Sequence, residues 1–233
     1  MVGDIHGDLN SLDYILDHFQ EGMAIFLGDY GDRGEEQIEV YLKILGLKTK
    51  YPDRVVMLRG NHETDDVYPH DLPTVLEKRY GKDGEGLHRA LQELWSKLPI
   101  LALGNYAMVH GGAPSRLESL DRIGDVENEI LWNDPGDIDG SDPSMRGIGN
   151  VFGKDVTRDF LDLTGAKTLI RSHQPCDGIK VWHDGMGITL FSRLGPPYQN
   201  ELGAYLNLDL QTRFDGYGLA RVAKRFSAKD LSQ

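Results

Sequence analysis

The run GDYGDRG at Gly28–Gly34 places two carboxylates and a guanidinium close together between glycines. The apolar residues 23–27 precede it and predict a buried strand that delivers a loop at its carboxyl end, where open α/β sheets hold their ligands. Glycines allow such a loop to adopt positive φ and to approach an ion or a phosphate. Because a carboxylate has two oxygens, Asp29 can bridge two cations and leave Asp32 and Arg33 for other roles.

Polar side chains follow other apolar runs in the same way. They are Asn61 and His62 after Val55–Leu58, His110 after Tyr106–Val109, and His173 after Thr168–Ser172. Asp4 and His6 lie on a glycine-flanked turn near the chain start, where both can reach one cation. Strands usually run about five or six residues, but only Val2 precedes this turn. We therefore expect either a short edge of the sheet or missing upstream residues.

Amphipathic helices are predicted between the strands. The first follows the Asp4 turn, with Asn10 or Ser11 as its N-cap. Pro73 suits the first turn of a later helix, and Gly81 suits its C-cap. Gly104-Asn105 predicts a hairpin turn. Late strands are predicted around residues 180–183, 187–192 and 203–210. The chain has no repeat, linker or low-complexity segment, so we expect one domain.

The composition argues against several classes of partner. Of the 233 residues, 39% are hydrophobic and 27% are charged, which is typical of a soluble globular protein. The 37 acidic and 25 basic residues give a formal charge of −12, which disfavours nucleic acid or an anionic membrane as the main partner. No run approaches the roughly 18 apolar residues of a membrane span. Cys176 is the single cysteine and cannot form an internal disulfide, so we expect a reducing, cytoplasmic location.

The polar side chains at the predicted strand ends form a set of metal ligands made only of nitrogen and oxygen. The candidates are Asp4, His6, Asp29, Asn61, His110 and His173. Such donors suit manganese, iron, zinc or cobalt in a catalytic site. The simplest division gives one metal to Asp4, His6 and Asp29, and the other to Asp29, Asn61, His110 and His173.

Two divalent ions beside two carboxylates would leave a positively charged site, and Arg33 and Arg146 add to that charge. A phosphate monoester dianion fits such a site. Two ions about 3.5–4 Å apart lower the pKa of a shared water and hold both ends of an in-line displacement. His62 is placed to protonate the leaving alkoxide, with Asp32 orienting its ring.

The chain resembles the phosphoprotein phosphatase family in a set of motifs that follow the family's order. They are GDIHG at Gly3–Gly7, GDYGDRG at Gly28–Gly34, RGNHE at Arg59–Glu63, HGG at His110–Gly112, LWNDP at Leu131–Pro135 and RSHQ at Arg171–Gln174. The resemblance implies an α/β metallophosphatase (calcineurin-like) sandwich of two mixed β-sheets flanked by helices, with residues 1–233 as a single metallophosphoesterase catalytic domain. It also implies a dinuclear centre, with manganese as the expected metal and iron, zinc or cobalt as alternatives.

The activity that the resemblance implies is hydrolysis of phosphoserine and phosphothreonine by direct attack of a metal-bridging water, with phosphotyrosine as a further candidate substrate. Matching positions imply that Arg33, Asn61 and Arg146 bind the phosphate, and that Tyr198 is the tyrosine of the family's late loop at Ser192–Gln199. The expected partners are phosphorylated proteins or peptides. No regulatory subunit is evident.

Two other functions stay open. A hydrolase of dinucleoside polyphosphates or other small phosphoesters would use the same fold. A non-catalytic phosphoprotein-binding scaffold would have lost the chemistry, and the intact ligand set disfavours it.

Several polar residues outside the motifs have an open or structural interpretation. Arg193 either adds positive charge at the rim of the cleft or is solvated. Cys176 is not expected to act as a nucleophile, because a metal-bound water makes one unnecessary. Four histidines are interpreted as surface or hydrogen-bonded side chains: His18, His70, His88 and His183.

Overall fold

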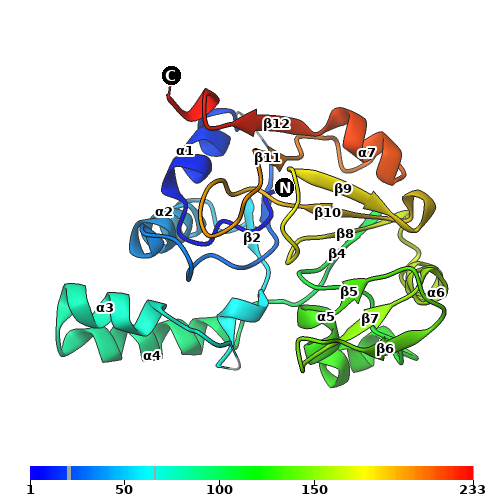
Figure 1. The fold of residues 1–233 in the computed structure, drawn as a ribbon, viewed down its shortest axis with the longest axis horizontal. Helices are drawn as coiled ribbons and strands as arrows, with labels where there is room; N and C mark the ends of the chain where they lie inside the picture. Colours follow the sequence, from blue (N-terminus) through cyan, green and yellow to red (C-terminus); the bar gives the residue numbers. More distant parts are fainter. Residues whose placement is uncertain (20–21, 66, 233) are drawn as a thin grey trace.

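Two β-sheets face each other in the protein, with helices on both outer sides (Figure 1). The computed structural model describes residues 1–19, 22–65 and 67–232. Each sheet contains both parallel and antiparallel neighbours. The predicted fold class, an α/β sandwich of two mixed sheets flanked by helices, is confirmed.

The first sheet is held together by the short segment at the chain start. Its longer strands are β1 (Ala24–Phe26), β2 (Val55–Met57), β11 (Leu202–Tyr205) and β12 (Lys224–Ser227). β1 and β2 are parallel, and β11 and β12 are antiparallel. Val2 lies between the two pairs, with a parallel bridge to Phe26 and an antiparallel bridge to Tyr205. We expected a short edge of the sheet at this segment. It is instead a single bridging residue, Val2, in the middle of the sheet.

The second sheet has the order β3-β4-β8-β10-β9. Its strands are β3 (Ala102–Leu103), β4 (Tyr106–Met108), β8 (Thr168–Arg171), β9 (Ile179–Trp182) and β10 (Gly187–Leu190). β3 and β4 form the hairpin predicted at Gly104-Asn105. β4, β8 and β10 run parallel, so β4 and β8 carry the residues that follow them to the same edge.

A third, smaller sheet was not predicted from the sequence. It contains β5 (Asp134–Pro135), β6 (Ser141–Pro143) and β7 (Asn150–Phe152) in the order β5-β7-β6. Prolines and aspartates are depleted in strands, and the pieces are only two or three residues long, so no alternating pattern marks them. The sheet matters because β5 begins at the aspartate of the LWNDP motif.

Successive residues of the central strands point to opposite faces and fill two kinds of core. Ile25 of β1 packs between the sheets with Met108, Ile170 and Ile188. Phe26, its neighbour, points outward into a second core. The helices of the first side pack there: α1 (Leu9–Asp17), α2 (Gln37–Lys50), α3 (Leu72–Tyr80) and α4 (Asp83–Trp95).

The other helices pack against the second sheet. α5 (Glu127–Trp132) and α6 (Lys154–Thr164) pack on the outer face of the second sheet, and α7 (Gly216–Val222) contacts β9 and β10. Short 3-10 turns complete the chain: η1 (Asn61–Glu63), η2 (Leu120–Val126), η3 (His183–Gly185) and η4 (Asp230–Ser232). Within the described residues, none of the helices is long and apolar enough to cross a membrane.

The expected helix ends agree with the structure in one case and differ in another. Pro73 lies in the first turn of α3, and Gly81 is its C-cap with φ of +59°. The N-cap predicted for α1 was wrong. Asp8 is the N-cap, because its carboxylate accepts a hydrogen bond from the backbone N–H of Ser11. The helix therefore begins directly after the Asp4 turn.

We expect Gly3→Ala to destabilise the fold, because an added Cβ would lie 2.1 Å from the carbonyl oxygen of Leu190, a clash with backbone. Overpacking of this kind costs about 1–3 kcal/mol of unfolding free energy. Gly46→Ala is the matched control: it lies in α2 with open space around the added Cβ, so it should stabilise by up to about 1 kcal/mol. Urea unfolding of the two variants measures both. Equal effects would contradict the close approach at Gly3.

Candidate active site

The candidate site residues converge at the carboxyl ends of the parallel strand pairs. Asp29 follows β1, Asn61 and His62 follow β2, His110 follows β4, and His173 follows β8. A cleft of about 630 Å³ opens beside them, and its lining includes His6, Asp29, Arg33, Asn61, His62, Trp132, Arg146, His173 and Tyr198. Asp4, Asp32 and His110 lie behind this lining and are almost fully buried. The structure thus gathers the residues predicted for the site around one cleft.

The backbone at the site is held in an unusual conformation. Among the described residues, seven non-glycine residues have a positive φ, which places them in the left-handed region of backbone conformation. Five of them are site candidates: His6, Asp29, Asp32, Arg33 and His173, with φ between +44° and +69°. Such conformations cost on the order of 1–3 kcal/mol each and persist only where the surrounding structure fixes them. The fold therefore holds these side chains in position around the cleft, and this costs stability.

Glu63 fixes the position of the Asp29 loop against the Asn61 loop. Its carboxylate accepts backbone N–H groups from Asp29 at 2.7 Å, Tyr30 at 3.0 Å and Gly60 at 3.0 Å, and the hydroxyl of Tyr41 at 3.1 Å. Burial, and then the charge of Asp29, raise the pKa of Glu63 to about 7. Gly60 is required here, because a Cβ would lie 2.2 Å from a carboxylate oxygen of Asp29.

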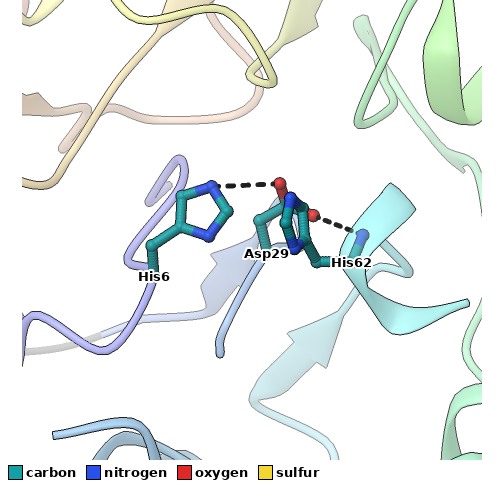
Figure 2. Close-up of side chains that lie close together, drawn as sticks. All are labelled: His6, Asp29 and His62. Carbon is teal, nitrogen blue, oxygen red and sulfur yellow. Dashed lines mark hydrogen bonds and ion pairs between the residues drawn. The ribbon is translucent and has the colours of Figure 1, made fainter. Parts of the chain in front are cut away.

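The two carboxylate oxygens of Asp29 face two different groups of ligands. Oδ2 lies 3.2 Å from Nε2 of His6, and Oδ1 lies 3.4 Å from Nε2 of His110. Figure 2 shows the His6 contact on one oxygen and the backbone N–H of His62, which donates to Oδ1 at 3.0 Å, on the other. Asp29 is thus placed between the two clusters, as expected for a bridging ligand.

The ring nitrogens that face Asp29 are free to bind a metal. Nδ1 of His6 donates to the carbonyl of Gly31 at 2.9 Å, and Nδ1 of His110 donates to the carbonyl of Leu27 at 3.0 Å. A carbonyl only accepts, so Nδ1 carries the hydrogen in both rings and Nε2 presents its lone pair in the neutral form. Metal-ligating histidines are usually oriented by a bond of this kind.

Several acceptors converge on the second side of Asp29. Oδ1 of Asn61 lies 2.8 Å from Nε2 of His110 and 2.8 Å from Nδ1 of His173, and these two nitrogens are 3.2 Å apart. A proton or a cation must separate these groups. Burial by itself would lower the pKa of His110, but Asp29 and the other nearby charges outweigh it and raise the pKa to about 9. A metal ion would replace that proton.

Two further observations support the fit of divalent cations. Oδ2 of Asp4 is buried and has no hydrogen-bond partner within the part of the chain that the structure describes. Ligand atoms also gather in two compact groups, one of His6, Asp29 and His62 and one of Asp29, His110 and His173. The first group contains His62 where the sequence placed Asp4. Oδ2 of Asp4 lies 3.6 Å from Nε2 of His6, so Asp4 borders the same position.

His62 forms a hydrogen-bonded pair with Asp32 beside these clusters. Nδ1 of His62 donates to Oδ2 of Asp32 at 2.7 Å. Oδ1 of Asp32 accepts the backbone N–H groups of Asp71 and Leu72 at the start of α3. Burial would raise the pKa of Asp32, but the hydrogen bond from the His62 ring and the contact with the Asp71 carboxyl outweigh it and lower the pKa to about 2. Asp32 is therefore a carboxylate that orients His62 through one ring nitrogen and leaves the other available.

Both arginines predicted to bind phosphate line the cleft. Arg33 follows directly after Asp32, and Arg146 comes from the loop between β6 and β7. Nε of Arg146 donates to Oδ2 of Asp134 at 3.0 Å, and the other oxygen of Asp134 accepts from the buried Arg171 at 2.9 Å. Asp134 thus connects the third sheet to the second one and positions Arg146.

Tyr198 reaches the cleft from the late loop. Its ring centroid lies 5.6 Å from that of His6 and 5.2 Å from that of Phe191. Burial, followed by the charge of Asp4, raises the pKa of Tyr198 above its ordinary range, so its hydroxyl stays protonated and can donate to a bound anion.

Both interpretations of Arg193 from the sequence were wrong. The side chain neither adds positive charge at the rim of the cleft nor lies in solvent. The side chain is buried, and its guanidinium donates to the backbone carbonyls of His6, Leu194 and Pro196. It also lies over the ring of Tyr198, at 5.2 Å from the ring centroid. Arg193 therefore fixes the late loop against the Asp4 turn. Its proximity to both segments is a long-range contact that no local pattern signals.

The four histidines outside the motifs differ from one another. His18 is exposed, and the ring of His183 bonds to Thr157 and to the carbonyl of Gly136. His88 packs against Trp95. His70 differs from the structural interpretation, because its Nε2 lies 3.6 Å from Oδ2 of Asp32, the oxygen that orients His62.

Comparison with known proteins gives the family. The sequence model described as calcineurin-like phosphoesterase matches residues 1–177. A catalytic subunit of protein phosphatase 2A from Dictyostelium discoideum is 34% identical over 247 residues, which cover 94% of this chain and 77% of that protein. The chain therefore belongs to the calcineurin-like phosphoesterase family.

Other similarities agree with this assignment and show how much of the relatives the chain covers. Serine/threonine-protein phosphatase T of Schizosaccharomyces pombe is 37% identical over 203 residues, which are 77% of this chain and 41% of that protein. A Saccharomyces cerevisiae serine/threonine phosphatase structure, described as similar to human PP5, superposes with a TM-score of 0.81 at 26% identity and covers 97% of this chain and 78% of that one. The chain spans about half the length, or less, of several curated relatives.

We expect the wild-type protein to bind two divalent ions and Asp29→Asn to weaken both sites, because each oxygen of Asp29 faces its own cluster. Asp4→Asn should weaken only one, because Asp4 borders the His6 side. Asp13→Asn, a change of the same type at a partly exposed carboxylate in α1, is the control and should bind two ions. Isothermal titration with Mn²⁺ gives the stoichiometry. A single lost site in Asp29→Asn would contradict its bridging position.

Proposed function

We propose that the protein is a metal-dependent serine/threonine phosphatase. The observation that carries the proposal is the His62–Asp32 pair, which stands at 2.7 Å directly beside two groups of ligand atoms that share Asp29. A nitrogen and oxygen ligand set, a positioned proton donor and two flanking arginines are the parts that hydrolysis of a phosphate monoester needs. The relatives named serine/threonine phosphatases support this choice of reaction.

His62 would donate the proton to the leaving alkoxide. Its Nδ1 is bonded to Asp32, so Nε2 is the nitrogen left to transfer a proton. Asp32 would hold the ring in place and stabilise its positively charged form before transfer. The low pKa of Asp32 supports this role, because the carboxylate remains charged at neutral pH.

Arg33, Arg146, Asn61 and Tyr198 would bind the phosphate. All four line the cleft, and Arg146 is aligned by Asp134. Guanidinium groups suit a phosphate because they offer parallel N–H donors. The Tyr198 hydroxyl would add a neutral donor.

The ligand atoms support two divalent ions. Asp4, His6 and Asp29 would hold one, and Asp29, Asn61, His110 and His173 would hold the other. When bound, the ions would supply a water of lowered pKa and would neutralise charge on the phosphate. The nitrogen and oxygen donors suit manganese, which is the metal that we propose, and they also suit iron, zinc or cobalt.

We propose phosphorylated proteins or peptides as substrates and residues 1–233 as a single catalytic domain. Residues 178–233 lie beyond the matched family segment, but β10 pairs with β8 and β11 pairs with Val2, which supports one domain. The negative formal charge supports neither nucleic acid nor an anionic membrane as a partner. The single cysteine supports a cytoplasmic location. Burial raises the pKa of Cys176 to about 12, which suits no nucleophilic role.

The proposal predicts Mn²⁺-dependent release of phosphate from a phosphothreonine peptide, abolished by EDTA. His62→Asn should lower kcat by about 10²-fold or more, because a positioned proton donor contributes on that order. His18→Asn, the same substitution at an exposed histidine outside the cleft lining, should leave kcat unchanged. Colorimetric phosphate assays at saturating peptide measure all three proteins.

The other outcomes of this assay separate the alternatives. Full activity in His62→Asn would remove His62 from the reaction. Wild type that binds two ions and cleaves diadenosine tetraphosphate but not the peptide would be a small-phosphoester hydrolase. Wild type that binds the phosphopeptide and cleaves neither compound would be a scaffold.

A further inference from the structure

We propose that His70 is a second imidazole that holds Asp32 in place and thereby positions His62 for proton transfer. This inference rests on the proposed phosphatase function. His70 lies outside the motifs, and its sequence context predicts only a surface position or a structural hydrogen bond. The observation behind it is that Nε2 of His70 faces the same oxygen of Asp32, at 3.6 Å, that accepts from His62.

The lone pairs of Asp32 show why a further donor fits there. An ionised carboxylate has about four acceptor positions, two on each oxygen. The backbone N–H groups of Asp71 and Leu72 take both positions on Oδ1, at 3.0 and 2.9 Å. Nδ1 of His62 takes one on Oδ2. Oδ2 accepts no other hydrogen bond from the described backbone, and Nε2 of His70 faces this oxygen at 3.6 Å.

The His70 ring has a nitrogen that lacks a hydrogen-bond partner. Nε2 is buried and has no hydrogen-bond partner among the described residues. A buried N–H without a partner is costly, so a donor next to an unfilled carboxylate position forms a natural pair. At 3.6 Å the contact is within ion-pair range but longer than a hydrogen bond. Catalytic hydrogen bonds are often long in the absence of substrate and tighten when it binds.

The environment of His70 fixes the ring against Asp32. Its ring centroid lies 5.9 Å from that of Trp95 and 5.4 Å from that of His88. Trp95 is buried in the α2–α4 core, so the ring rests on a rigid surface. His70 thus links the position of the α4 helix to the orientation of the proton donor.

A purely structural role for His70 is the competing explanation. In that case the ring would only fill space in the cluster of His70, His88 and Trp95. His88 separates the two explanations, because it packs on the same Trp95 and also has a buried Nε2 without a hydrogen-bond partner within the described chain. Of the two, only His70 has a recorded ion-pair contact with Asp32.

The test compares two substrates that differ in their need for a proton. When the P–O bond of a phosphothreonine peptide breaks, the threonine oxygen leaves as an alkoxide that must be protonated, whereas p-nitrophenyl phosphate releases a stable p-nitrophenolate. His70→Phe should lower kcat about tenfold on the peptide and less than about twofold on p-nitrophenyl phosphate, because it weakens only proton donation. A structural defect at the site would lower both rates equally, and that result would overturn the proposal.

Two control variants sharpen the comparison. His70→Gln keeps an N–H donor near the position of Nε2 and should stay within about threefold of wild type on both substrates. His88→Phe should leave both rates within about twofold, because the ion-pair contact with Asp32 is made by His70 and His88 packs on Trp95. Failure of the glutamine to restore the peptide rate, or an equal loss in His88→Phe, would contradict a role through Asp32.

A measurement independent of activity shows which ring nitrogen of His70 carries hydrogen. Long-range ¹H–¹⁵N spectra of protein loaded with Zn²⁺, which is diamagnetic, report which ring nitrogen carries hydrogen, and His70→Gln identifies the His70 signals. The proposal requires hydrogen on Nε2. A ring protonated only on Nδ1 would overturn it, because a bare Nε2 would face a carboxylate lone pair. If wild type cleaves neither substrate, the proposed function fails, but these spectra still test His70.

Discussion

The structure depends on the Asp29 carboxylate, whose two oxygens face two separate groups of ligand atoms. Oδ2 faces Nε2 of His6, and Oδ1 faces Nε2 of His110. A buried carboxylate surrounded by acceptor atoms is unfavourable unless positive charge sits among them. Protons or divalent ions at two positions would meet this requirement. The placement of Asp29 between the clusters thus determines what the cleft can bind.

The rest of the fold serves to hold that carboxylate in place. The loop after β1 passes so close to the loop after β2 that only glycine fits at Gly60, and Glu63 ties the two loops together through three backbone N–H groups. Val2 connects the halves of the first sheet, which brings the Asp4 turn to the same edge. Asp29 keeps its positive φ because these contacts hold the loop in a single conformation. Stability lost at the site is offset by the two cores on either face of the first sheet.

The sequence predicts the parts of this arrangement that depend on local pattern. The apolar runs before Asp29 and Asn61 are strands in the structure, and polar side chains directly after parallel strands necessarily meet at one edge. Long-range contacts were not predictable in this way. Arg193 is buried against distant carbonyls, and His70 reaches Asp32 across 38 residues, although neither lies in a motif. The third sheet escaped prediction because its strands are too short and polar to show a period. Side-chain contacts of this kind are set by tertiary packing, which only the folded chain reveals.

Anomalous diffraction from crystals grown with Mn²⁺ would test the two-cluster arrangement most directly. Two peaks are expected about 3.5–4 Å apart, one on each oxygen of Asp29, with the first bordered by His6 and Asp4 and the second by His110 and Asn61. A single peak, or two peaks that do not share Asp29, would contradict the bridging role on which the proposed chemistry depends.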